Sequence, residues 1–294
     1  MRRSLQAALV WAGFFAAGAC SAVVVRDDRG GTITMSAPAT RIIALSPHLA
    51  EIVFAAGAGD RLAAVVRYSD YPAAAKRLPS VGDASRIDLE RVLALSPDLI
   101  LGWRSGNPPA DVQRLQRLGF RVFMTEPRRI ADIAQILRVV GALAGSSAVA
   151  DAAATDLERA LAQLRAHYSK RKPVRVFYEI WHRPLLTING LHLINDVVEL
   201  CGGVNVFAGA ATLTPSVSLE AVVAARPDVI LGGSSASTAQ DLIAQWRRAP
   251  ITVLRHLPVR YVPPDLIQRQ TPRIFEGARM VCAHLEQVRS EGGR

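Results

Sequence analysis

The sequence predicts an α/β protein with two similar Rossmann-like lobes, each built on a mainly parallel sheet, joined by one long helix. Three observations predict this fold. Short apolar strands alternate with helical segments, a nineteen-residue segment occurs twice, and one long segment near the middle contains neither glycine nor proline. Such alternation is typical of parallel sheets covered by helices. At roughly 150 residues per domain, the 294 residues also suggest two domains.

The repeated segment is the strongest internal evidence for two similar lobes. Residues 87–105 are IDLERVLALSPDLILGWRS, and residues 217–235, at an offset of 130, are VSLEAVVAARPDVILGGSS. Ten of the nineteen positions are identical, far more than chance would give. Each copy predicts a capped helix, a Pro-Asp turn and a buried strand.

The N-terminal lobe is expected over residues 23–145. Val23–Arg26 and Thr32–Met35 flank a polar, glycine-containing turn and predict a β-hairpin. Ser46 and Pro47 predict the N-cap and first residue of a helix that stops at Gly57. The other expected elements are strands at 41–45, 62–66, 99–102 and 121–124 and a helix at 109–118.

A linking helix is expected over residues 146–170, and the C-terminal lobe over residues 173–288. The linking segment is rich in alanine, leucine and charged residues and ends at a basic stretch before Pro173. The second lobe is expected to contain strands at 174–180 and 229–232 and helices at 196–201, 239–248 and 275–288.

Residues 1–20 are predicted to be an export signal. Two arginines precede an apolar run at 7–19, and the small residues Ala17-Gly18-Ala19 stand before Cys20. Cys20 also resembles the lipidated cysteine of lipoproteins, although such boxes usually have leucine where this chain has Ala17. Two outcomes stay open, a lipid anchor through Cys20 or cleavage near Cys20 or Ala22 to a soluble periplasmic form.

Composition and motifs favour a small-molecule binding protein. The net charge of +10 comes from scattered arginines, so no nucleic-acid partner is expected. No catalytic motif is present, and the six histidines are dispersed, so no catalytic residue or metal ligand is assigned. Small ligands bind between lobes. An exported metal-dependent enzyme is the alternative of another class. Cys201 and Cys282 could form a disulfide in an oxidising compartment or remain two buried thiols.

Several short motifs between about Arg41 and Leu285 resemble one family. The chain is similar to the periplasmic binding proteins of ABC importers for metal chelates, whose lobes are joined by a helical backbone (class III architecture). Two of the motifs, Tyr68-Ser69-Asp70-Tyr71-Pro72 and Gly102-Trp103-Arg104-Ser105-Gly106-Asn107, resemble its corrinoid-binding branch. The motifs are Ser46-Pro47-His48, Tyr68-Ser69-Asp70-Tyr71-Pro72, Leu89-Glu90-Arg91 with Pro97-Asp98-Leu99, Gly102-Trp103-Arg104-Ser105-Gly106-Asn107, Cys201-Gly202-Gly203-Val204-Asn205 and Pro272-Arg273.

The resemblance implies a monomeric substrate-binding protein that is not an enzyme. It would capture a corrinoid such as cobalamin and deliver it to an ABC permease dimer, with no resident cofactor. Aromatic rings would cover the apolar macrocycle, and polar groups would meet its amide rim. The resemblance also implies that Cys201 and Cys282 are paired. The expected ligand-binding residues are Tyr68, Tyr71, Trp103, Trp181, Asp265 and Arg269.

The chain departs from the corrinoid branch where that branch has further tryptophans. Ala84, Thr214 and Leu266 stand at those positions. Trp181 could replace part of the lost aromatic surface, and its neighbour His182 could be structural or approach the metal of a ligand. A ferric siderophore or haem therefore remains an alternative ligand.

Glu90 and Glu220 occupy equivalent positions in the two copies of the repeat. Each is expected in the first turn of a helix, after Asp88 or Ser218 as N-cap, where an acid complements the helix dipole. The interaction with the helix dipole alone could explain an acid at each of these two positions. Equivalent acids on two lobes would also suit a dimeric permease, and the resemblance implies that they meet arginines on it.

Overall fold

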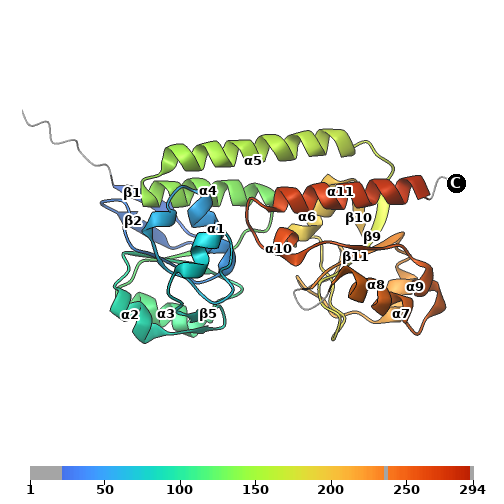
Figure 1. The fold of residues 1–294 in the computed structure, drawn as a ribbon, viewed down its shortest axis with the longest axis horizontal. Coiled ribbons are helices and arrows are strands. Elements are labelled where there is room, and N and C mark those ends of the chain that lie inside the picture. The colour runs from blue at the N-terminus through green and yellow to red at the C-terminus, as the bar shows by residue number, and fades with distance from the viewer. Residues whose placement is uncertain (1–21, 235–237, 292–294) are drawn as a thin grey trace, which may run out of the picture.

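The computed structural model describes residues 22–234 and 238–291. The predicted signal at 1–20, Cys20 and the last residue of the repeat, Ser235, lie outside this range. Figure 1 shows two lobes side by side beneath a layer of long helices. Within the described residues, no helix has the length and apolar character needed to cross a membrane.

The first lobe contains a hairpin and a four-stranded parallel sheet. The hairpin pairs β1 with β2 in the antiparallel sense, as predicted. The elements of the first lobe are β1 (Val23–Arg26), β2 (Thr32–Met35), β3 (Ile42–Ala44), α1 (Pro47–Ala55), η1 (Gly59–Arg61), β4 (Leu62–Ala64), η2 (Ala73–Arg77), β5 (Gly82–Asp83), β6 (Arg86–Ile87), α2 (Leu89–Leu95), β7 (Leu99–Trp103), α3 (Pro109–Arg117), β8 (Val122–Thr125) and α4 (Ile130–Ala144).

The second lobe contains another four-stranded parallel sheet and is reached through α5 (Ser147–Tyr168). Its elements are β9 (Val174–Glu179), α6 (Leu193–Leu200), β10 (Gly203–Asn205), α7 (Leu219–Ala224), β11 (Val229–Gly232), α8 (Ala239–Arg247), α9 (Thr252–His256), β12 (Val259–Tyr261), α10 (Pro264–Ile267) and α11 (Ile274–Glu291).

The two sheets have the same topology. Their strand orders are β4-β3-β7-β8 and β10-β9-β11-β12, so both run second, first, third, fourth in chain order. All these pairs are parallel, which confirms the predicted α/β class. Apolar clusters cover both faces of each sheet, as expected for a doubly wound fold.

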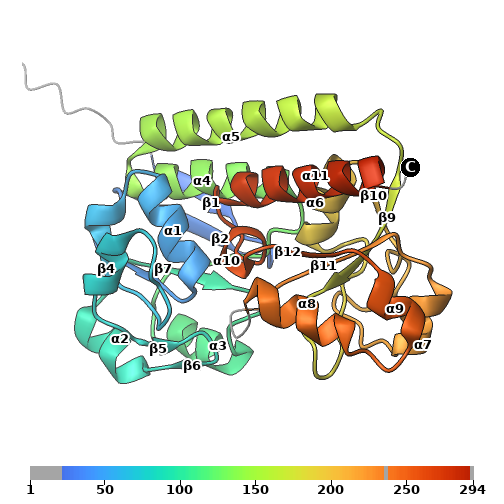
Figure 2. The same ribbon diagram turned by 45° about the vertical axis from the view of Figure 1, so that its right-hand side comes forward.

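Three long helices form the layer that holds the lobes together. Figures 1 and 2 show α5 extending over both lobes, above α4 on one side and α11 on the other. A Cβ atom at Gly141 of α4 would lie 2.2 Å from the Cβ atom of Ala150 in α5, so glycine allows this close approach. Helices α5 and α11 were predicted from the sequence, whereas α4 was not.

The repeat forms the same local structure in both lobes. The side chains of Asp88 and Ser218 cap α2 and α7 by accepting a hydrogen bond from the backbone N–H three residues on. At the other end, Ser96 and Arg226 both have a φ of 46°, in the left-handed region. The chain therefore leaves each helix through the same turn.

The acid of each Pro-Asp turn ties that turn to the first strand of its sheet. Asp98 accepts hydrogen bonds from the backbone N–H groups of Thr40 and Arg41, at 2.7 and 3.0 Å. Asp228 accepts one from the backbone N–H of Arg175, at 2.7 Å. The repeated Pro-Asp pair thus has a structural role in aligning the sheets.

The second lobe contains the disulfide Cys201–Cys282, with a Cα–Cα distance of 4.7 Å. This confirms the expected pairing. Helix α6 ends at Leu200, so Cys201 is its C-cap and not its last helical residue as predicted. The bond joins that helix end to α11.

Candidate ligand-binding site

The topology indicates where a ligand would bind. In a doubly wound sheet, crevices form at the carboxyl ends of the strands where the chain connections diverge to opposite sides. Here those points lie between β3 and β7 and between β9 and β11. Trp103 is the last residue of β7, and Trp181 follows β9 closely. One predicted tryptophan therefore stands at the switch point of each sheet.

Arg269 of the second lobe connects it to the first. Its Nη1 atom donates to Asp70 Oδ1 at 2.7 Å and to Glu51 Oε1 at 3.0 Å. Nη2 lies 3.0 Å from Asp265 Oδ1 and donates to the carbonyl oxygen of Tyr68 at 3.5 Å. The guanidinium of Arg269 thus contacts four oxygen acceptors. They lie on loops and helices at the carboxyl ends of strands.

Arg273 adds a second cation to the same cluster. Its Nη1 lies 3.3 Å from Glu51 Oε2, and its guanidinium lies over the Tyr71 ring, 4.1 Å from the centroid. Burial raises the pKa of Glu51, and both arginines oppose that shift. Burial acts in the same sense on Asp70, but the hydrogen bond and charge of Arg269, together with a backbone hydrogen bond and the charge of Lys76, outweigh it and lower the pKa of Asp70.

Three predicted aromatic side chains are unusually exposed. Tyr68 is 75% exposed, Tyr71 47% and Trp181 46%. Tyr68 has a φ of 67°, which is uncommon for a bulky residue and is often found at functional sites. The Nε1 atom of Trp181 donates to the carbonyl oxygen of Arg183 at 2.9 Å, which fixes the indole plane. Exposed rings in the segments that follow the carboxyl ends of strands are suited to contact an apolar ligand.

Trp103 is held more firmly. Its backbone N–H donates to Asn107 Oδ1 at 2.7 Å, and a Cβ atom at Gly106 would lie 1.8 Å from its ring, so only glycine allows this loop path. His48 packs edge-on against the indole, with centroids 5.3 Å apart. Burial, together with the charge of Arg269, lowers the pKa of His48 to about 3, so the imidazole is neutral.

The structure therefore brings together four of the six predicted ligand residues. Tyr68, Tyr71, Asp265 and Arg269 surround the Glu51 carboxylate or its arginines. Trp103 and Trp181 stand at separate switch points. Glu51 was not predicted as a site residue. The one sign of it in the sequence is an acid on the apolar face of α1, the helix over Pro47–Ala55.

Glu90 and Glu220 lie away from this cluster. Both are exposed in the first turns of α2 and α7. In Figures 1 and 2 these two helices lie at the side of the lobes farthest from α5. Hydrogen bonds from its own backbone N–H and from Ser218 lower the pKa of Glu220, so this acid is ionised at neutral pH.

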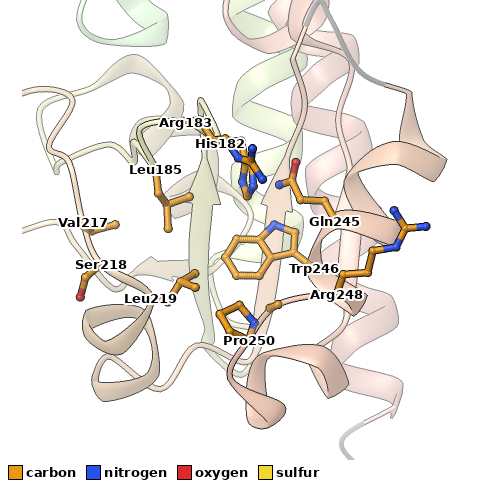
Figure 3. A pocket seen from close by; sticks show the side chains of 11 residues that line it. His182, Arg183, Leu185, Val217, Ser218, Leu219, Gln245, Trp246, Arg248 and Pro250 are labelled. Carbon is orange, nitrogen blue, oxygen red and sulfur yellow. The ribbon is translucent and has the colours of Figure 1, made fainter.

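A cavity of about 710 Å³ lies elsewhere, within the second lobe (Figure 3). It is lined by none of the six predicted ligand residues, so the case for the site depends on the exposed rings and the charged cluster. No group of three or more metal-ligating His, Cys, Asp or Glu side chains occurs in the described part of the chain.

Comparison with known proteins identifies the family. The model of the periplasmic binding protein family matches residues 42–253. The vitamin B12-binding protein of Vibrio cholerae serotype O1 is 36% identical over 249 residues, which cover 85% of this chain and 90% of that protein. The vitamin B12-binding protein of Yersinia pestis is 38% identical over 250 residues, covering 85% and 88%.

Solved structures agree. The periplasmic vitamin B12-binding protein of Vibrio cholerae has a TM-score of 0.77 and 35% identity, with 86% of this chain and 98% of that chain covered. The periplasmic haem-binding protein of Roseiflexus sp. RS-1 has a TM-score of 0.72 but 22% identity, over 84% and 98% of the chains, so it supports the fold alone. The chain belongs to the periplasmic binding protein family.

Proposed function

We propose that this protein binds a corrinoid, with cobalamin as the expected ligand, and delivers it to an ABC import permease. The observation that carries the proposal is the identity of 36–38% to vitamin B12-binding proteins over 85% of the chain. In this proposal residues 23–145 and 173–288 form the two lobes, and residues 146–170 form the linking helix.

The chemistry of the site supports a large, partly apolar ligand with polar edges. Tyr68, Tyr71 and Trp181 offer exposed rings, and Trp103 offers a firmly held one. Asp265 and Asp70 keep about half of their side-chain surface exposed beside Arg269 and can accept amide hydrogens. Because the family consists of binding proteins, the protein is not an enzyme and no catalytic residue is assigned.

Arg269 has a second role in this proposal. Its guanidinium already contacts three carboxylates, so it is better suited to orient Asp70 and Asp265 than to bind the ligand alone. At Ala84, Thr214 and Leu266 the chain supplies no aromatic ring, so the macrocycle would rely on Trp181 in the second lobe.

Titration calorimetry on the purified protein tests the ligand. We expect heat with cobalamin and cobinamide and none with haem or ferric siderophores. Heat with haem and none with either corrinoid would replace the corrinoid proposal with a haem carrier.

We also propose that Glu90 and Glu220 dock the loaded protein onto the two permease subunits. They are exposed and occupy equivalent turns of α2 and α7, the helices that lie at the side of the lobes farthest from α5 in Figure 1. Charge reversal at both positions, Glu90→Arg with Glu220→Arg, should abolish uptake into vesicles while cobalamin affinity stays unchanged. Normal uptake by that variant would return both acids to a helix-capping role.

Export completes the proposal, with the mature protein in the periplasm. Intact mass of the mature protein distinguishes its two forms, because acylation of Cys20 adds lipid mass and cleavage to a soluble form does not.

A further inference from the structure

Two hollows flank the repeated helices, and each lies beside a proposed docking acid. In the first lobe a hollow of about 520 Å³ is lined by Ile87, Asp88, Leu89 and Glu90 at the start of α2. In the second lobe, Val217, Ser218 and Leu219, the equivalents of the first three, line the cavity of about 710 Å³ at the start of α7. The hollows are therefore related by the same duplication as the acids.

The chemistry of the two hollows is different. The first-lobe hollow is largely charged. Besides the four residues named above, Gly82 and four charged residues line it, namely Arg67, Asp83, Arg86 and Arg114. Arg67 and Asp83 form an ion pair of 2.6 Å within it.

The second-lobe hollow has an apolar interior. Figure 3 shows Leu185, Leu219 and Pro250 around the indole of Trp246, with His182 and Gln245 at one end. Among the described residues, Arg183 and Arg248 also line this hollow, but no acidic side chain does.

Hydrogen bonds hold two side chains of the second-lobe hollow in place. Trp246 is 1% exposed, and its Nε1 donates to Glu179 Oε2 at 2.5 Å. Gln245 Nε2 donates to the same carboxylate at 2.9 Å. Leu219 is only half-buried at the start of α7, so its side chain can contact a group that enters from outside. A preformed apolar hollow binds without a large ordering cost.

We propose that the second-lobe hollow takes an apolar side chain from a periplasmic loop of one permease subunit, whereas the first-lobe hollow makes ionic contacts with the other. This inference rests on the docking role proposed above. We infer a permease side chain as the occupant of the second-lobe hollow because the hollow adjoins the proposed docking surface. Leu219 lines the hollow, and the next residue, Glu220, is the docking acid. Two identical subunits thus meet two unlike halves of one docking surface.

A matched pair of variants tests this asymmetry. Leu219→Gln and Leu89→Gln change the equivalent half-buried residue in each hollow at similar volume. Binding of the cobalamin-loaded variants to the cognate permease in nanodiscs would be measured at about 0.05 and about 0.5 M NaCl, since salt screens ionic contacts. We expect Leu219→Gln to weaken binding about tenfold at both salt concentrations, consistent with loss of a buried apolar contact. Leu89→Gln should change it less than about twofold.

Leu185→Gln, on the opposite wall, is a second variant and should also weaken permease binding. Equal effects of Leu219→Gln and Leu89→Gln, or no effect of Leu219→Gln and Leu185→Gln, would overturn the inference. So would saturable binding of anilinonaphthalene sulfonate, a flat apolar anion, that Leu219→Gln abolishes while permease affinity stays unchanged, because the hollow would then be a small-molecule site. Circular dichroism checks the fold of each variant.

The proposed function is tested separately in the same experiment. A wild-type protein that binds no cobalamin in isolation would overturn the proposed ligand. A loaded wild-type protein that does not bind the permease would overturn the docking role. The difference between the two leucine variants concerns the asymmetry alone.

Discussion

In the first lobe a capped helix and a left-handed turn at Ser96 lead into β7, and in the second lobe the same elements, with a turn at Arg226, lead into β11. The strand orders also agree. The surfaces at the carboxyl ends of the strands differ between the two lobes. The first lobe supplies Tyr68, Tyr71 and the carboxylates of Glu51 and Asp70. The second lobe supplies the two arginines that contact them and one further carboxylate, Asp265. Duplication thus preserved the residues that shape each lobe, while those that face the partner lobe became complementary.

The largest difference in stability between the lobes should come from the disulfide, which only the second lobe has. Replacing Cys201 and Cys282 by alanine should lower the free energy of unfolding by about 4 kcal/mol, because the bond closes a loop with a sequence separation of 81. Denaturant unfolding measures the loss, and hydrogen exchange locates it. We expect faster exchange in β9–β12 and little change in β3–β8. A loss below about 1 kcal/mol would contradict the prediction.

The charged cluster between the lobes should give the next largest effect. Arg269→Met leaves Glu51, whose side chain is 3% exposed, with Arg273 as its remaining cation, and should destabilise the protein by about 3 kcal/mol. Adding Glu51→Gln should recover part of the lost stability, because the buried carboxylate charge is then absent.

Thermal unfolding of the single and double variants measures this coupling. Arg67→Met is the matched control, because its ion pair with Asp83 is exposed within the first lobe and should matter little. If Arg269→Met and Arg67→Met unfold alike, the cluster does not hold the lobes together.

The predicted tryptophans test whether both lobes contribute equally to the ligand. Trp103→Ala and Trp181→Ala should each weaken cobalamin binding by about 2 kcal/mol, or roughly thirtyfold, through loss of a contacting ring. Titration calorimetry measures the affinity, and circular dichroism checks the fold. Unchanged affinity in Trp103→Ala would assign that ring to packing, whereas unchanged affinity in Trp181→Ala would leave the binding rings in the first lobe alone.

The fold could be predicted because its signals are local. The repeat, the hairpin and α5 follow from caps, breakers and apolar periodicity within short segments. Helix α4 was not assigned, although apolar residues recur along one face of it.

The site was less predictable because its contacts are remote in sequence. Glu51 and Arg269 are 218 residues apart, and no local sequence pattern predicts their ion pair. A buried acid on a helix and a distant arginine are each unremarkable in a sequence, and only the arrangement of the two sheets brings them together.

The last prediction concerns two histidines that follow the first strand of their sheets. His48 follows β3 and is buried, whereas His182 follows β9 and is partly exposed. Burial lowers the pKa of both, and that of His48 falls from 6.5 to about 3. Between these values the unfolded chain binds a proton at His48 and the folded protein does not. Stability should therefore fall as the pH is lowered through this window.

The slope that His48 contributes should approach about 1.4 kcal/mol per pH unit, the value for one proton. His48→Gln should remove that slope even if it also changes stability at neutral pH, because no group then titrates at this position. His182→Gln should flatten the profile less, since its side chain keeps part of its contact with water. Unfolding free energies between pH 7 and pH 4 measure the three profiles. Parallel profiles for the wild type and His48→Gln would mean that protonated His48 is accommodated in the fold, and the buried contact with Trp103 would then be looser than its geometry indicates.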